Sequence, residues 1–242
     1  MIKLKDGSAT ELAQLDRLEQ FDEKSKNFRI GDVHTATKPL RSYTWRCDQW
    51  YDQGREGACV AYSLGHEASS RPAEVTHLTD PFLKQQVYWE AQKIDPWPGG
   101  EYPGATPNYG GTSVLAGIKV LYKKLFFKEY RWAMDFRELL VGIGYNGPAV
   151  LGVPWYEGMY RPNADGYIKP TGRVMGGHAI LARAINVKTK TVTLRNSWGK
   201  GWGHTGDCYI SFDDLETVVR DRADMAFMLK RNTNPLEDLT KA

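Results

Sequence analysis

The chain has 242 residues, of which 41% are hydrophobic and 25% are charged, an ordinary balance for a globular protein. Its net charge of +3 comes without any block of lysine or arginine, so nothing in the composition indicates a nucleic-acid partner. No stretch approaches the ~18 consecutive apolar residues of a membrane span, and the first residues lack the apolar core of a secretory signal.

The first half of the chain is predicted to be mainly helical. Residues 8–22 are expected to form a short polar helix with three leucines on one face, and residues 59–69 a helix after a glycine-marked turn. Further helices are predicted over residues 80–93 and 112–125. The stretch between them, residues 95–111, is rich in proline and glycine and is expected to be an ordered loop or a flap.

Alternating and β-branched runs begin at about Lys128 and predict strands. The runs cover residues 148–153, 178–185, 191–198, 208–212 and 223–230. A helical half followed by a β half predicts an α+β fold with a groove between the two parts.

The chain contains three cysteines, Cys47, Cys59 and Cys208, an odd number that leaves at least one thiol free in the monomer. So few cysteines favour a reducing, cytoplasm-like compartment. No spacing of the Cys-x-x-Cys or His-Glu-x-x-His kind is present, so we expect no metal site and no cofactor.

Cys59 has the setting of a nucleophilic cysteine. A thiol reacts as the thiolate, and a helix N-terminus together with a neighbouring imidazolium lowers the pKa of a cysteine by several units. Glycines precede Cys59 and a helical pattern follows it, which predicts a position at a helix N-terminus. The alternative interpretation is a buried structural cysteine.

His178 is the expected general base and acid, because it follows two glycines and starts a predicted strand. The other histidines are expected to lie too far along the helix of Cys59 or in polar connectors: His34, His66, His77 and His204. Asn196 ends the next strand. In an antiparallel hairpin that turns at Val187, it comes nearly opposite His178 on the same face, where its amide oxygen fixes the imidazole tautomer.

Three segments in this order resemble the papain-like cysteine peptidases. Residues 53–63, QGREGACVAYS, resemble the family's nucleophile segment. Residues 176–180, GGHAI, resemble its histidine strand, and residues 195–210, RNSWGKGWGHTGDCYI, its asparagine motif. The resemblance covers about residues 43–230. It implies a two-lobe fold in which the nucleophile helix packs against an antiparallel sheet or barrel, with the active-site cleft between the lobes.

The resemblance implies a role for each matching residue. Cys59 would be the nucleophile, His178 the general acid and base, and Asn196 the group that orients the histidine. Gln53 would stabilise the oxyanion together with the backbone N–H of Cys59. Trp198 would cover the hydrogen bond between the histidine and the asparagine. The implied substrate-binding residues are Gly57, Gly110, Gly111, Gly177 and Trp198.

The resemblance also places a substrate pocket. Residues 147–153 match the strand that lines the pocket for the second residue before the cleaved bond. The pocket is expected to draw on Thr112, Ser113, Ala149, Met175 and Ala179. These side chains suggest room for an apolar side chain of the substrate.

The chain departs from familiar members of the family at Glu56 and Val60, which stand where a disulfide cysteine and a tryptophan are usual. Its N-terminal extension is too short for a long helical prosegment. In this respect the chain is similar to compact bacterial or bacteriophage members of the family. We expect residues 1–40 to form either a strap across the back of the fold or a short removable blocker. The expected remainder is a peptidase domain at 41–230, with a helical lobe at about 41–127 and a β lobe at about 128–230, and a flexible tail at 231–242.

The expected activity is hydrolysis of peptide bonds in a peptide or protein substrate, through a thioester on Cys59. The alternatives are a lytic enzyme that cleaves the peptides of peptidoglycan, a transpeptidase or ligase, and a catalytically silent binding or structural protein of the same fold. The expected location is the cytoplasm, or the host cytoplasm or virion if a bacteriophage encodes the chain. No membrane partner is expected, and the oligomeric state stays open.

Overall fold

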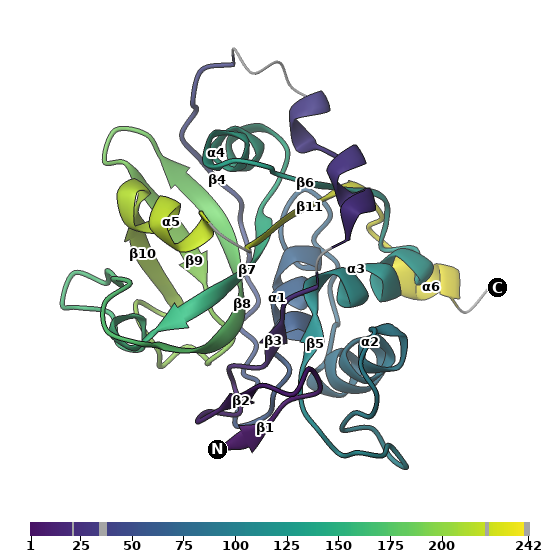
Figure 1. The fold of residues 1–242 in the computed structure, drawn as a ribbon. Coiled ribbons are helices and arrows are strands. Elements are labelled where there is room, and N and C mark those ends of the chain that lie inside the picture. The colour runs from purple at the N-terminus through teal and green to yellow at the C-terminus, as the bar shows by residue number, and fades with distance from the viewer. Residues whose placement is uncertain (21, 34–37, 221–222, 240–242) are drawn as a thin grey trace.

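The computed structural model describes residues 1–20, 22–33, 38–220 and 223–239. Four of the helices, those within residues 59–123 and 235–239, gather on one side of the molecule, and a twisted sheet with two further helices packed on it forms the other side (Figure 1). This arrangement confirms the α+β, two-lobe expectation. None of the helices in these residue ranges is long and apolar enough to cross a membrane.

The helical lobe is built around one central helix, α1, in which every residue is buried. The helices are α1 (Cys59–Ala68), α2 (Trp89–Ile94), α3 (Val114–Lys123), α4 (Phe136–Tyr145), α5 (Phe212–Val219) and α6 (Pro235–Leu239). Short 3-10 turns lie at Glu23–Asn27, Ile30–Asp32 and Glu157–Met159, and a π-helical stretch at Phe82–Tyr88 leads into α2. The predictions of α1, of the helix ending in α2 and of α3 are confirmed. Helices α4 and α5 were not predicted, although Asp135 and Ser211 cap their first turns.

The sheet of the β lobe is antiparallel, with strand order β10-β9-β8-β7-β11-β6 and with β4 paired to β8. Its strands are β4 (Tyr43–Thr44), β6 (Phe127–Trp132), β7 (Ala149–Tyr156), β8 (Val174–Asn186), β9 (Thr191–Arg195), β10 (Asp207–Ser211) and β11 (Asp224–Arg231). The strands predicted from the alternating runs are therefore confirmed, whereas β4 and β6 were not predicted.

Alternate residues of β7 and β8 belong to two different hydrophobic cores, one on each face of the sheet. Leu151 and Ile180 point to the core shared with α4 and α5, whereas Val150 and Leu181 point to the core shared with α1 and α3. Both faces are covered, which explains why these strands are continuous hydrophobic runs. The strand that carries His178 is thereby fixed against the helix that carries Cys59.

The β8–β9 hairpin differs from the expected register. Leu181 pairs with Arg195 and Ala182 with Leu194, and a bulge at Arg183 shifts the pairing nearer the turn. Continued along the strands, this register puts Asn196 beside Ile180 and two positions from His178. Asn196 is therefore offset by two residues from the expected nearly opposite position, and this shift is by an even number of residues. The two side chains consequently stay on the same face, as predicted.

The described residues of the range 8–22 do not form the predicted helix, and Phe21 of that range lies outside the described residues. Residues 1–20, called the N-terminal segment below, contain instead three short strands, β1 (Ile2–Lys3), β2 (Ala9–Thr10) and β3 (Arg17–Leu18). Strand β3 pairs in parallel with β5 (Thr112–Ser113) of the helical lobe. Leu15 and Leu18 are fully buried in this extended form. Tertiary burial of separate leucines therefore outweighs a weak helical pattern.

The N-terminal segment lies between the two lobes, where Figure 1 shows β3 between β8 and β5. The 3-10 turns at 23–27 and 30–32 then lead along α4 and β6. At the other end, Arg231 closes β11 and α6 covers residues 235–239 of the expected flexible tail; residues 240–242 lie outside the described ranges.

Candidate active site

Cys59 is the first residue of α1 and is fully buried. The residue before it, Ala58, provides no side-chain cap, and the Asp16 carboxyl accepts a backbone hydrogen bond from Cys59 at this end of the helix. The Sγ atom of Cys59 accepts a hydrogen bond from the backbone N–H of Ala179 at 3.3 Å. Because Ala179 follows His178 directly in β8, this contact places the thiol one residue along the strand from the predicted histidine.

His178 and Asn196 interact as the sequence predicts. The Nε2 atom of His178 lies 2.8 Å from Oδ1 of Asn196, and both residues are buried. The rings of Trp198 and Trp155 lie 5.0 and 4.7 Å from the imidazole, measured between centroids. They cover the pair and exclude water from its hydrogen bond. The other ring nitrogen, Nδ1, has no hydrogen bond of good geometry among the described residues.

Gln53 is held in place by the loop after β9. Its Oε1 accepts a hydrogen bond from the hydroxyl of Ser197 at 2.5 Å, and its backbone N–H donates to the Ser197 carbonyl. The side-chain amide donates to the Glu56 carbonyl at 2.8 Å, and the carbonyl of Gln14 lies 3.5 Å from the same nitrogen. The amide is therefore fixed in orientation and already faces a carbonyl of the N-terminal segment.

The N-terminal segment lies directly over these residues. Asp16 forms a parallel bridge with Gly177, and Leu4 forms one with Gly110. Close contacts of the backbone make glycine necessary at three of the predicted substrate-binding positions. A Cβ atom at Gly57, Gly111 or Gly177 would lie 3.0 Å or less from Asp16 or Arg17. An extended polypeptide is thus already bound along the predicted substrate-binding residues.

Asp16 contacts the Cys59 thiol directly. Its Oδ1 accepts a hydrogen bond from Cys59 Sγ at 3.1 Å, and its Oδ2 lies 3.0 Å from the hydroxyl of Tyr88. That hydroxyl also lies 2.6 Å from a carboxyl oxygen of Glu101 and accepts the N–H of Gly111 at 2.9 Å. One phenolic proton cannot serve two carboxyl groups at once. Tyr88 therefore donates to only one of the two carboxyl groups.

Burial disfavours the charged forms of Cys59, His178 and Asp16 while the segment is in place. Burial raises the pKa of the Cys59 thiol well above its ordinary value, and the Asp16 carboxyl adds to that rise. Burial also lowers the pKa of His178 to about 4, although the Asn196 hydrogen bond and the Gln14 carbonyl oppose this. Burial raises the pKa of Asp16 to about 7, against hydrogen bonds from Cys59 and Tyr88. A neutral thiol beside a neutral imidazole is a resting arrangement, not a reactive one.

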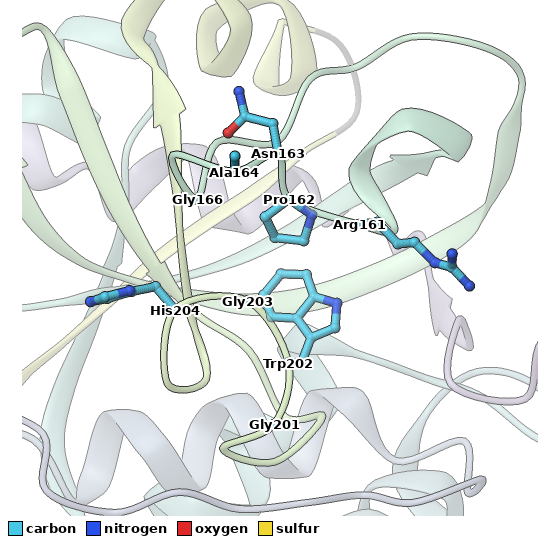
Figure 2. Close-up of a pocket in the computed structure, with 9 residues that line it drawn as sticks. All are labelled: Arg161, Pro162, Asn163, Ala164, Gly166, Gly201, Trp202, Gly203 and His204. Atoms are coloured by element: carbon cyan, nitrogen blue, oxygen red, sulfur yellow. The ribbon is translucent and has the colours of Figure 1, made fainter.

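A cavity of about 330 Å³ opens beside the aromatic residues, lined by residues 161–164, Gly166 and residues 201–204. Figure 2 shows the Trp202 ring facing Pro162 across it, with Arg161 and His204 directed to opposite sides. The Trp202 ring packs edge-on against Trp198, 5.3 Å away between centroids. The cavity therefore borders the aromatic cover of His178 and is separate from the thiol.

The structure brings together all four predicted catalytic residues and sets four of the five predicted binding residues against the N-terminal segment or its neighbours. Sequence reasoning missed Asp16, Tyr88 and Asp224, because none belongs to a motif and all three make their contacts with distant segments of the chain. All three cysteines are free and buried. Among the described residues, no group of three or more His, Cys, Asp or Glu side chains is placed to hold a metal ion.

Comparison with solved structures identifies the fold. The chain is similar to xylellain, a cysteine protease from Xylella fastidiosa, with a TM-score of 0.70 and 18% identity over 92% of this chain and 98% of that one. It is also similar to procathepsin L2 from the larval midgut of Tenebrio molitor, with a TM-score of 0.58 and 16% identity over 88% and 77% of the two chains. The protein has the papain-like fold.

A third similar structure is the Carica candamarcensis cysteine protease CMS1MS2 in complex with E-64, with a TM-score of 0.55 and 18% identity over 81% of this chain and all of that one. Neither a family model nor a curated protein matches the amino-acid sequence. At these identities the likeness establishes the fold, and the chemistry is inferred from the residues of this chain.

Proposed function

We propose that the protein is a cysteine peptidase, held in a latent form by its own N-terminal segment. The observation that carries this proposal is the extended polypeptide lying over Cys59, backbone-paired to Gly177 on one side and to β5 on the other. A surface that binds one extended chain in this way suits a peptide substrate. The buried His178–Asn196 pair beside the thiol supplies the groups that acyl transfer needs.

The reaction follows from these positions once the segment leaves. Removal of Asp16 exposes the thiol and takes away the neighbouring carboxyl, so a proton can pass from Cys59 to His178. The thiolate attacks the substrate carbonyl, the imidazolium gives its proton to the leaving amine, and a thioester remains. Water then attacks the thioester while His178 accepts its proton, which releases the acid and regenerates the thiol. Gln53 and the first N–H of α1 would stabilise the oxyanion.

The N-terminal segment is assigned the role of an inhibitor. Its Asp16 carboxyl accepts a hydrogen bond from the Cys59 thiol, and its backbone lies where the backbone of a substrate would bind. Of the two roles expected for residues 1–40, a removable blocker fits residues 1–20 better than a strap across the back. Displacement of the segment or cleavage after it would then activate the enzyme.

The test uses the full chain with the two plugging side chains removed, Asp16→Ala with Arg17→Ala, called the opened variant. We expect one adduct of E-64 by intact mass and hydrolysis of fluorogenic peptide amides. Cys59→Ala in the same background should abolish both, whereas Cys208→Ala, the matched loss of a buried thiol, should keep both. A folded opened variant whose Cys59 reacts with neither E-64 nor iodoacetamide would contradict the proposal.

The remaining candidates give different results in the same experiment. A catalytically silent binding protein would show no hydrolysis even when Cys59 is alkylated. A lytic enzyme would label with E-64 but cleave peptidoglycan peptides in preference to linear ones. A ligase would yield aminolysis products when a free amine is added.

A further inference from the structure

Arg17, the residue after Asp16, is buried in a pocket of its own. Its side chain is 2% exposed, although arginine is among the residues most rarely buried. Its Nε and Nη2 atoms both donate to Oδ2 of Asp224, at 2.9 and 2.6 Å. The guanidinium is therefore bound by a charge-assisted pair, the strongest class of hydrogen bond in proteins.

The pocket belongs to the folded domain and not to the segment. Asp224 is the first residue of β11 and pairs with Gly152 of β7. A Cβ atom at position 152 would lie 2.4 Å from the Asp224 carboxyl, 2.7 Å from Arg17 Nε and 2.9 Å from Val114. Gly152 thus makes the space in which the guanidinium lies. Gly177 forms another wall, since a Cβ there would meet the carbonyl and the Cδ atom of Arg17.

Removal of the segment would leave a carboxyl group facing an empty pocket. The Asp224 side chain is only 11% exposed with Arg17 in place. Burial raises the pKa of Asp224, while the charge and hydrogen bonds of Arg17 lower it. A buried carboxylate that loses its cation carries an uncompensated desolvation cost, and an incoming cationic side chain would relieve it. A cavity of about 140 Å³, lined in part by Asp224 and Gln20, adjoins the same carboxyl group.

We propose that Asp224 is a specificity-determining residue that selects a basic side chain, arginine or lysine, in the peptide substrate. The inference rests on the proposed peptidase function. The position concerned is the one next to the residue at the thiol, because Arg17 follows Asp16, whose carboxyl contacts Cys59. In the latent form, Arg17 of the N-terminal segment occupies this pocket and holds the segment in place. This proposal differs from the apolar pocket expected from the sequence, because it puts a buried acid beside Gly152.

The experiment compares fluorogenic peptide amides that differ only at this position, with arginine, lysine, leucine or glutamate, on the full-length opened variant. We expect kcat/KM for arginine to exceed that for leucine by at least about tenfold, with glutamate the poorest. Adding Asp224→Asn should reduce the arginine-to-leucine ratio to about one. Adding Gly152→Ala, which fills the space for the guanidinium, should reduce the ratio as well.

The matched control is Asp165→Asn, which removes the same charge from an exposed loop beside Tyr209 and should leave the ratio unchanged. Thermal unfolding of each variant shows that it is folded; Asp224→Ser replaces Asp224→Asn if the latter is not. A preference for leucine, or a ratio that Asp224→Asn does not change, would overturn the proposal.

Failure of the peptidase proposal can be told apart from failure of this one. If no peptide is cleaved, the same arginine and leucine peptides are titrated by calorimetry against the opened variant carrying Cys59→Ala. Tighter binding of the arginine peptide that disappears with Asp224→Asn supports the pocket independently of catalysis. Equal affinities of the two peptides would refute it.

Discussion

Asp16 and Arg17 are neighbours in the chain, yet the fold surrounds them with opposite chemistry. Asp16 is buried near the Glu101 carboxyl, and the hydrogen bonds from Cys59 and Tyr88 offset this only in part, so its negative charge is disfavoured there. Arg17 meets a buried carboxylate that balances its positive charge. Asp16 therefore covers the thiol, and its contribution to stability depends on its protonation. Arg17 anchors the segment and stays charged. The following changes separate these two roles.

The largest effect is expected from Arg17→Ala. It leaves Asp224 buried without its cation, and breaking a buried pair in this way costs about 3–5 kcal/mol. The segment should then leave Cys59 far more often, and alkylation of the thiol by iodoacetamide should accelerate by about 10²–10³-fold, since each 1.4 kcal/mol is a factor of ten. Intact mass against time measures the rate. An unchanged rate in a folded variant would show that Arg17 does not anchor the segment.

Asp16→Asn should change the pH dependence. The Asp16 pKa rises from 3.8 to about 7 on folding, so its contribution to stability is fully present below about pH 4 and is lost as the pH rises to about 7. A shift of this size corresponds to about 4 kcal/mol. The free energy of unfolding of the wild type, relative to the variant, should therefore fall by up to that amount over this range.

Urea denaturation at several pH values measures the difference between the two proteins. The lowered pKa of His178 makes the free energy of unfolding rise with pH, which is the opposite trend. Because His178 is present in both proteins, its effect cancels in the comparison. Parallel pH profiles for wild type and variant would show that Asp16 is not the proton-dependent group.

Lys5→Ala tests whether a buried cation far from the thiol anchors the segment equally well. Lys5 donates to Asp95 at 2.7 Å and to the Gln92 carbonyl, with both charged side chains fully buried. Asp95 retains hydrogen bonds from Thr112 and the backbone of Trp97, so the loss should be smaller than at Arg17, about 1.5–3 kcal/mol. The alkylation rate should rise by about tenfold to a hundredfold. A rise as large as that of Arg17→Ala would contradict this ranking.

Arg173→Ala should have the smallest effect and serves as the control for charge. Arg173 pairs with Glu11 of the same segment, but both side chains are largely exposed, 63% and 47%. Exposed pairs contribute less than about 1 kcal/mol. The alkylation rate should change by less than about fivefold, and a larger change would mean that surface charge, not burial, holds the segment.

Much of the active site could be read from local sequence patterns. Cys59 at a helix start and His178 and Asn196 on one face of a hairpin follow from periodicity within short stretches of chain. The hairpin prediction survived a register shift of two residues because side chains alternate with a period of two. A shift of one would have separated the pair.

The N-terminal segment shows where such reasoning fails. Its leucines have a spacing compatible with a helix, but Leu15 and Leu18 are buried one by one between the lobes, in contact with glycines more than ninety residues away. Nothing local distinguishes a short amphipathic stretch from a strand that completes another part of the protein. Its conformation is decided by the surface that receives it.

The sequence by itself determined the α+β class, the place of Cys59 at a helix start and the pairing of His178 with Asn196, because each depends on patterns within short stretches of chain. Only the tertiary structure decided that Asp16 lies against the thiol and that Arg17 reaches Asp224, 207 positions away in the chain. The physical reason is that burial creates these interactions. In water, the side chain of an aspartate or an arginine has no strong preference for one interaction partner. It acquires such a preference only where the fold excludes water and leaves a single partner within reach.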